Sequence, residues 1–143
     1  MLTIARILLT LAAVQWGLVP LMVDLTETHV FKPDWPPHAR LHAVWLLSTG
    51  AILAVYAVGL LWTSGAEKAH RLRHASVIGA IVLAGFFAAA LTTDMYGGAF
   101  TEQAEPDTVF GINTNIFAFA VAAVLQAIGA YIIWTKLPRP NDD

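Results

Sequence analysis

Four long apolar runs constrain the fold of this chain more than any other feature of its sequence. The runs cover about residues 3–24, 38–62, 76–96 and 110–135, and each carries few charged residues. A run of about 18 or more such residues is long enough to cross the hydrocarbon core of a bilayer as a helix. Lipid offers no hydrogen-bond partners, so each crossing segment must satisfy its backbone groups internally, which favours helices. The runs therefore predict four membrane-spanning helices.

The overall composition agrees with a membrane location. Of the 143 residues, 57% are hydrophobic and only 13% are charged, with a mean hydropathy of +0.64. Soluble domains carry roughly 25% charged residues, so this chain has too little polar surface to cover itself in water. The absence of cysteine excludes disulfides, thiolate catalysis and iron–sulfur clusters. No basic tract or RNA-binding motif is present, so nucleic acid is not an expected partner.

Short connections between the predicted helices favour an up-down-up-down bundle, so we expect an all-α, integral membrane four-helix bundle formed by one domain over residues 1–143. Arg6 followed by apolar residues resembles a signal peptide, but the run is too long and lacks an A-x-A-type cleavage site. Pro20 predicts a kink near the end of the first helix. Small residues four apart, such as Gly50 and Ala54, predict close helix packing and are also compatible with a homodimer.

Basic residues divide unevenly between the two ends of the predicted bundle. One end holds only Lys32 and Arg40, and the other holds a larger group: Arg6, Lys68, Arg71, Arg73, Lys136 and Arg139. Lysine and arginine concentrate in cytoplasmic loops of membrane proteins. We therefore expect a multi-pass membrane protein with both termini in the cytoplasm. In a prokaryote this would be the inner membrane, with the opposite end of the bundle on the extracytoplasmic side.

The most polar stretch, DLTETHVFKPDWPPHARLHAVW, covers residues 24–45 and connects the first two spans. Pro37 suits the first turn of a helix, so the second helix is expected to begin near His38. His38 and His42 then lie one turn apart on the same face. Histidines at this spacing are typical of metal ligands and of proton-transfer groups.

All four predicted helices can contribute polar groups to one pocket at the extracytoplasmic end. Ionisable groups at membrane depth are costly and usually face a cavity or a partner. The predicted catalytic groups are His38, His42, Asp94, His29, Asp24 and Glu27. The predicted substrate contacts are Trp35, Trp45, Thr49, Asn113 and Asn115. A solvated rim is the alternative interpretation of the same residues.

Two further polar segments have less specific patterns. The loop over residues 97–109 contains Glu102, Glu105 and Asp107, and is either a solvated acidic loop or a lid over the pocket. His70 and His74 repeat the one-turn spacing, but they lie among basic residues on the cytoplasmic side. That pattern is typical of a turn that contacts lipid phosphates.

The stretch THVFKPDWPPHARLH resembles the signature of a small, uncharacterised family of four-span membrane proteins, T-H-x-F-N-P-x-W-P-P-H-A-[RK]-F-H. Lys32 replaces the Asn of that signature and Leu41 replaces the second Phe. The resemblance implies a fold and a shared site, but no established activity. The chain is also loosely similar to the emopamil-binding and sigma-2-receptor superfamily, whose members have histidine and acidic groups in a lipophilic cavity. Some members isomerise sterols with a His and a Glu one turn apart, where this chain has His38 and His42.

Three classes of function are compatible with these patterns. The leading hypothesis is a membrane-embedded enzyme performing acid–base chemistry, of the isomerisation, hydration or cyclisation type, on a small lipophilic substrate. It needs no cofactor. The second is a metal-dependent enzyme or metal-binding protein with zinc, iron or copper held by His29, His38 and His42. The third is a non-catalytic lipid or sterol binding protein. Membrane lipids are expected partners in each case.

Overall fold

The computed structural model of the protein describes residues 1–101 and 108–138. Four long helical segments, Leu2–Asp24, Pro37–Trp62, Lys68–Leu91 and Thr114–Lys136, are each long and apolar enough to cross a membrane. The predicted all-α fold with four membrane-spanning helices is confirmed. Arg139 and the acidic residues of the predicted lid lie outside the described residues: Glu102, Glu105 and Asp107.

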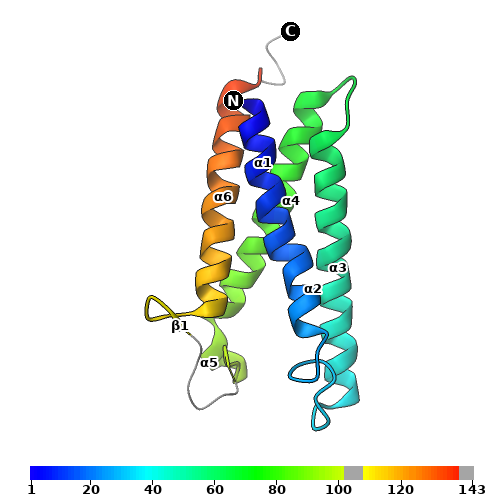
Figure 1. Cartoon of the computed structure of the whole chain (residues 1–143), viewed down its shortest axis with the longest axis vertical. Coiled ribbons are helices and arrows are strands. Elements are labelled where there is room, and N and C mark those ends of the chain that lie inside the picture. The colour runs from blue at the N-terminus through cyan, green and yellow to red at the C-terminus, as the bar shows by residue number, and fades with distance from the viewer. Residues whose placement is uncertain (102–107, 139–143) are drawn as a thin grey trace.

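Short irregular elements interrupt or extend the four segments (Figure 1). The first segment consists of α1 (Leu2–Ala13), the π-helical turn η1 (Val14–Leu18) and α2 (Val19–Asp24). It is followed by α3 (Pro37–Trp62) and by α4 (Lys68–Leu91), which the single turn α5 (Thr93–Tyr96) extends. An antiparallel hairpin of β1 (Thr108–Val109) and β2 (Ile112–Asn113) precedes α6 (Thr114–Lys136).

Two helices begin at residues other than those predicted. The helix α4 begins at Lys68 and not near residue 76, because the polar turn that precedes its apolar run is also helical. The helix α6 begins after the hairpin, where the side chain of Asn113 accepts a hydrogen bond from the backbone N–H of Asn115 at 2.9 Å. Such a cap satisfies one of the free N–H groups at a helix start and fixes the boundary there.

The four segments alternate in direction and enclose a common core. The first segment packs beside α6 and α3, and α4 packs beside both α3 and α6. Met1, the 63–67 connection and the end of α6 lie together at one end of the bundle, which we call the basic end (Figure 1). The 25–36 loop and the start of α3 lie at the opposite end, which we call the histidine end.

Two arginines of α4 fasten neighbouring segments at the basic end. Arg71 donates hydrogen bonds to the carbonyls of Thr63 and Gly65 at 3.4 and 3.1 Å, just beyond the end of α3. Arg73 is buried and donates to the carbonyl of Leu137 at 3.3 Å, just beyond the end of α6. The last carbonyls of a helix lack partners within the helix and attract cations, so these arginines stabilise the ends of both neighbouring helices.

The first segment changes its helical geometry near its middle. Pro20 has no N–H to donate to the carbonyl of Trp16, and the π-helical turn η1 ends two residues before it. The predicted irregularity therefore takes the form of a π-turn. Gly17 within this turn brings the first segment close to α3. A Cβ atom at this position would collide with the side chain of Ala54 and lie 2.9 Å from the carbonyl oxygen of Gly50.

The close approach at Gly17 predicts opposite effects for two glycine-to-alanine substitutions. Gly17→Ala should lower the stability of the detergent-solubilised protein by about 1–3 kcal/mol, the usual cost of overpacking. Gly59→Ala should leave it unchanged or slightly raised, because nothing lies within 4 Å of a Cβ built there and alanine favours the helix. Thermal unfolding of both variants measures the difference, and equal melting temperatures would contradict the observed helix contact.

Candidate functional site

Within the described part of the four long helices, buried residues are confined to the basic half and the middle of the bundle, and at the histidine end Val30 of the 25–36 loop is buried. No residue of α3 before Ala54 is buried, none of α4 after Leu83, and none of α6 before Ala122. The short helix α2 contains no buried residue at all. Ala54, Leu83 and Ala122 belong to one core cluster and therefore mark a common level. Toward the histidine end from this level, the helices do not form a closed core.

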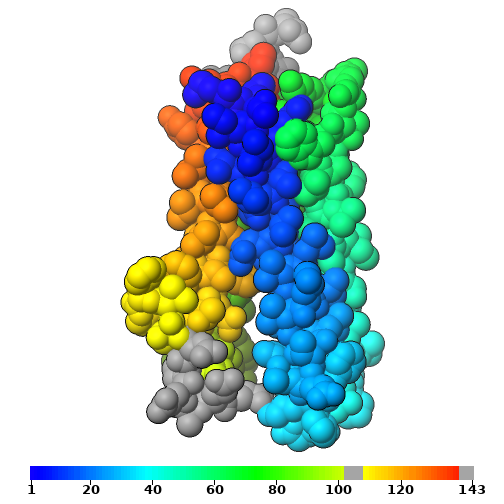
Figure 2. Space-filling model, viewed as in Figure 1, coloured from blue at the N-terminus to red at the C-terminus, as the bar shows by residue number. Residues whose placement is uncertain are grey.

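The histidine half opens between two pairs of helices. The helix α2 packs on α3, and stacked rings of Phe86 and Phe119, with centroids 3.7 Å apart, join α4 to α6. Between described residues, α2 makes no extended contact with α4 or α6. An open gap separates the blue-to-cyan pair from the green-to-yellow pair in the space-filling view (Figure 2). We call this gap the histidine-end cleft.

Trp16 lies at the level where the cleft begins. Its side chain is only 3% exposed and packs in the same core cluster as Ala54, Leu83 and Ala122. The indole Nε1 is buried and has no hydrogen-bond partner among the described residues. A buried indole N–H normally finds an acceptor, and leaving one unpaired costs roughly 1–3 kcal/mol. Trp16 therefore carries an unpaired hydrogen-bond donor inside the core cluster, at the level where the cleft begins.

His38 and His42 form a direct pair at the start of α3. Their Nε2 atoms are 3.0 Å apart, and their rings are edge to face with centroids 4.5 Å apart. One Nε2 must carry a hydrogen and donate it, while the other accepts. The ring of His42 also stacks on Trp45, with centroids 6.0 Å apart. The predicted helix start and the predicted one-turn pairing of the two histidines are therefore both observed.

The histidine pair does not point toward the first segment. His38, His42 and Trp45 are all exposed. With 3.6 residues per turn, they lie about 120 to 180° around the α3 axis from Ala54, which packs toward Gly17. The expectation that both histidines face the interior of the bundle is therefore not met. They lie at the rim of the histidine end.

Asp24 and His29 form a second polar group, at the end of α2 and in the following loop. Asp24 is partly buried, and the charge of His29 is close enough to interact with it. The Nδ1 of His29 is 3.0 Å from the hydroxyl of Thr28, which is itself 3.0 Å from that of Thr26. Glu27 lies in the same loop and is exposed. The short segment thus holds a chain of polar groups beside the cleft.

Arg40 holds the loop that carries these groups against α3. Its guanidinium donates to the carbonyls of Lys32 and Pro33 at 2.7 and 3.1 Å. Lys32 in turn forms an ion pair with Asp34 at 3.4 Å. Charge-assisted hydrogen bonds to backbone carbonyls restrain the loop more strongly than neutral ones. Arg40 therefore restrains the 25–36 loop against the start of α3.

The remaining predicted site residues are spread over four elements of the histidine half. Asp94 is exposed in α5, and Asn113 and Asn115 lie at the start of α6, where Asn115 donates to the carbonyl of Phe100 at 3.1 Å. Trp35 is partly buried in the loop and Thr49 is exposed on α3. The structure thus brings together His38 with His42, and Asp24 with His29, but it does not join these groups to Asp94.

No group of three or more histidine or carboxylate residues suited to a metal ion occurs within residues 1–101 and 108–138. The three candidate ligands divide between the loop, which carries His29, and α3, which carries His38 and His42. The separation of 3.0 Å between the two Nε2 atoms of α3 nevertheless suits neighbouring ligands of one ion, given nitrogen–metal distances of about 2.0–2.1 Å. Two protein ligands are the most that this geometry supplies.

Trp16 is not among the residues that the sequence patterns single out. It lies within the first apolar run, where a tryptophan is ordinary core material, and nothing in its neighbours marks it. Only two structural facts distinguish it: its Nε1 lacks an acceptor and its cluster ends at the cleft. A π-turn near the middle of the first segment, which often occurs at functional positions, is the local feature that places it there.

The chain belongs to the family described as Family of unknown function (DUF6640), which it matches over residues 8–137. The matched range includes the histidine end, three of the long helices in full and the first from residue 8 onward. No curated protein and no solved structure matches the chain. Similarity to the emopamil-binding and sigma-2-receptor superfamily stays a prediction.

Replacing Trp16 by phenylalanine tests whether its unpaired donor is reserved for a ligand. Trp16→Phe removes the Nε1–H while keeping most of the aromatic surface, so the ligand-free protein should become more stable or stay equally stable. Trp134→Phe is the matched control. Its Nε1 donates to the hydroxyl of Ser76 at 3.0 Å, so this variant should lose stability. Thermal unfolding after exhaustive delipidation compares the two, and a large destabilisation by Trp16→Phe alone would contradict the assignment.

Proposed function

We propose that the protein is a membrane-embedded enzyme that performs acid–base chemistry on a small lipophilic molecule held in the histidine-end cleft. The observation that carries this proposal is the unfilled half of an apolar bundle, with an unpaired indole donor buried in the core cluster next to it. Apolar cavities with a few convergent polar groups are the usual form of small-molecule sites. A substrate entering from the bilayer would fill the cleft and leave its polar end near the membrane surface.

The positions of the polar groups suggest the size of the substrate. Gly17, next to Trp16, contacts α3 at Gly50 and Ala54, and His42 lies 8 to 12 residues before them in the same helix. At about 1.5 Å per residue, the level of Trp16 and the rim are separated by roughly 12–18 Å along the bundle. A molecule that contacts both ends would therefore be elongated and mainly apolar, with one hydrogen-bond acceptor at the inner end.

The histidine pair supplies the proton chemistry in this proposal. Because one imidazole already donates to the other, the pair can pass a proton from one ring to the substrate and accept another in exchange. The carboxylate of Asp24, which interacts with the charge of His29, would stabilise positive charge at the histidine end. An isomerisation adds a proton at one atom and removes one from another, so neither oxidant nor cofactor is required. Hydration and cyclisation have the same requirement.

Deuterium exchange in a mixture of lipids tests the proposed chemistry, because the enzyme itself then selects its substrate. Purified protein incubated with a total lipid extract in deuterated water should introduce deuterium into one lipophilic species, detected by mass spectrometry. His42→Ala or His38→Ala should slow the exchange by about 100-fold or more, the contribution expected of general acid–base groups. The control replaces His70 and His74, the other one-turn histidine pair, at the basic end. An equal loss of deuterium exchange in that control would contradict the assignment of the chemistry to the histidine end.

A metal-dependent function is the second candidate, favoured by the Nε2–Nε2 separation of His38 and His42. A zinc, iron or copper ion held there would take its other ligands from water or substrate. Elemental analysis of protein purified without a histidine tag should then find one ion per chain, lost in His38→Ala. If lipophilic molecules copurify with the protein but neither a metal nor deuterium exchange is found, the non-catalytic lipid or sterol binder is the better description.

We also propose that both termini are cytoplasmic and that the histidine end is extracytoplasmic. Among the described residues, five basic side chains lie at the basic end, namely Arg6, Lys68, Arg71, Arg73 and Lys136, against Lys32 and Arg40 at the other. Basic residues stay on the cytoplasmic side during insertion. A cytoplasmically active reporter fused after Asp143 should therefore be active, and one inserted into the 25–36 loop inactive. The reverse pattern would invert the assignment. A homodimer stays a prediction from the small-residue spacing.

A further inference from the structure

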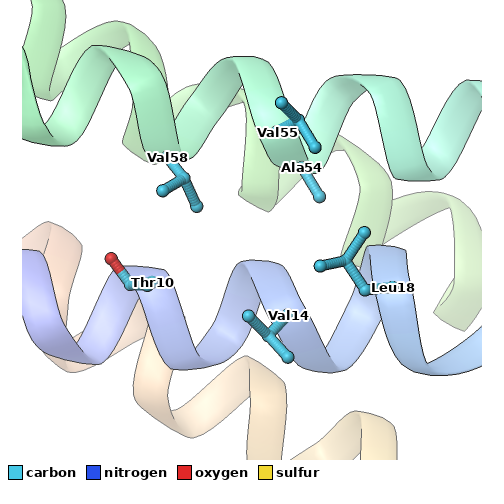
Figure 3. Close-up of a pocket in the computed structure, with 6 residues that line it drawn as sticks. All are labelled: Thr10, Val14, Leu18, Ala54, Val55 and Val58. Carbon is cyan, nitrogen blue, oxygen red and sulfur yellow. The ribbon is translucent and has the colours of Figure 1, made fainter.

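A groove on the membrane-facing side of the bundle runs between the first segment and α3, away from the histidine-end cleft. It has a volume of about 180 Å³ and is lined by six residues: Thr10, Val14, Leu18, Ala54, Val55 and Val58. Figure 3 shows Thr10, Val14 and Leu18 following one helix, with the three α3 side chains across the space from them. Val55 is 64% exposed and Val14 is 38% exposed, so the groove opens outward, toward lipid.

The lining is almost entirely apolar, and its one polar group is already engaged. The hydroxyl of Thr10 donates to the carbonyl of Arg6 at 2.8 Å and accepts a hydrogen bond from Nε1 of Trp62 at 2.9 Å. The groove is several times larger than the roughly 30 Å³ that a water molecule occupies in the liquid, but apolar walls do not hold water. A hydrocarbon chain is the occupant that suits this surface.

A cation lies at the end of the groove that is nearest the basic end. Arg6, Thr10, Val14 and Leu18 are four residues apart in succession, so they form one stripe along the first segment. The guanidinium carbon of Arg6 lies 5.7 Å from the centroid of the Trp62 ring, whose Nε1 donates to Thr10. Arg6, Trp62 and Thr10 therefore form a polar cap directly above the apolar groove.

Arg6 differs from the other arginines of the bundle. Arg40, Arg71 and Arg73 all donate to backbone carbonyls. Within residues 1–101 and 108–138, Arg6 makes neither a hydrogen bond nor an ion pair through its guanidinium. The single described carboxylate at the basic end belongs to Glu67, which lies in the α3–α4 connection and forms no ion pair.

Electrostatics favour an anion beside Arg6. A cation near the start of a helix is opposed by the positive end of the helix dipole, and an anion placed there interacts favourably with both the dipole and the guanidinium. Arginine binds phosphate through two parallel hydrogen bonds, which makes the pairing specific as well as strong. An acyl chain in the groove would continue directly from a phosphate at this height, because both lie along one stripe of the same helix.

We propose that the groove between the first segment and α3 binds one phospholipid of the leaflet at the basic end. Its phosphate pairs with the guanidinium of Arg6, and one acyl chain occupies the groove from Thr10 to Leu18. This distance is about 12 Å along the helix. The bound lipid covers the helix contact at Gly17 and supplies the counter-charge that the described part of the chain does not provide. The site is independent of the histidine-end cleft and of any chemistry there.

Lipid binding to the delipidated protein tests this assignment, with dioleoylphosphatidylglycerol as the probe. Native mass spectrometry should show one tightly bound molecule per chain. Dioleoylglycerol, which has the same chains and no phosphate, and inorganic phosphate, which has no chain, should each bind at least tenfold more weakly. Comparable binding of inorganic phosphate would mean that the site recognises only an anion. Comparable binding of dioleoylglycerol would mean that the site recognises only an acyl chain. Either result would overturn the proposal.

Two pairs of variants separate the contributions of charge and groove. Arg6→Gln should weaken binding by about tenfold or more, the loss of a charge-assisted contact, whereas Lys136→Gln, an exposed cation at the same end, should not. Arg6→Lys should retain part of the affinity. Val55→Trp should fill the groove and block the chain, whereas Val124→Trp on exposed α6 surface should not. Equal effects within either pair would show that the binding is not located at this groove.

Discussion

The close contact between the first segment and α3 at Gly17 is the constraint on which the rest of the structure depends. The absent side chain at Gly17 lets the two backbones approach to the point where the Gly50 carbonyl would be 2.9 Å from an added Cβ. In lipid, helices associate through such close packing, because the hydrophobic effect that drives folding in water is missing. The core clusters lie at this level and toward the basic end, and beyond it α2 stays with α3 while α4 and α6 remain together.

This division explains why the two ends of the bundle have different chemistry. At the basic end, arginines of α4 bind backbone carbonyls just beyond the ends of α3 and α6, so cations stabilise the fold directly. At the histidine end, Arg40 holds the 25–36 loop, and the imidazole pair stays exposed at the rim. Polar groups at membrane depth are tolerated where they have a partner or line a cavity. In the proposed catalytic site, polar groups lie near a cleft. In the proposed lipid site, the cation of Arg6 takes a lipid phosphate as its partner.

Some of the site residues could be recognised from sequence for physical reasons, and others could not. The pairing of His38 with His42 follows from helical spacing after Pro37, and the structure shows it. Their outward orientation was not predictable, because the sequence of α3 is apolar on nearly every face and gives no preference for one side. Trp16 was not recognised either, because it lies within the equally apolar first run. It stands out only because the core cluster that it forms with residues of three other helices ends at the cleft.

The sequence by itself determined the number of helices, their approximate limits and the concentration of titratable groups at one end, because span length and backbone hydrogen bonding in lipid leave few alternatives. Tertiary structure alone decided which faces meet and where the core ends. In a membrane-spanning helix, apolar residues face both lipid and protein, so hydrophobic periodicity does not distinguish the two sides. Contacts such as Gly17 against Ala54, and the unpaired donor of Trp16, exist only once the helices have packed.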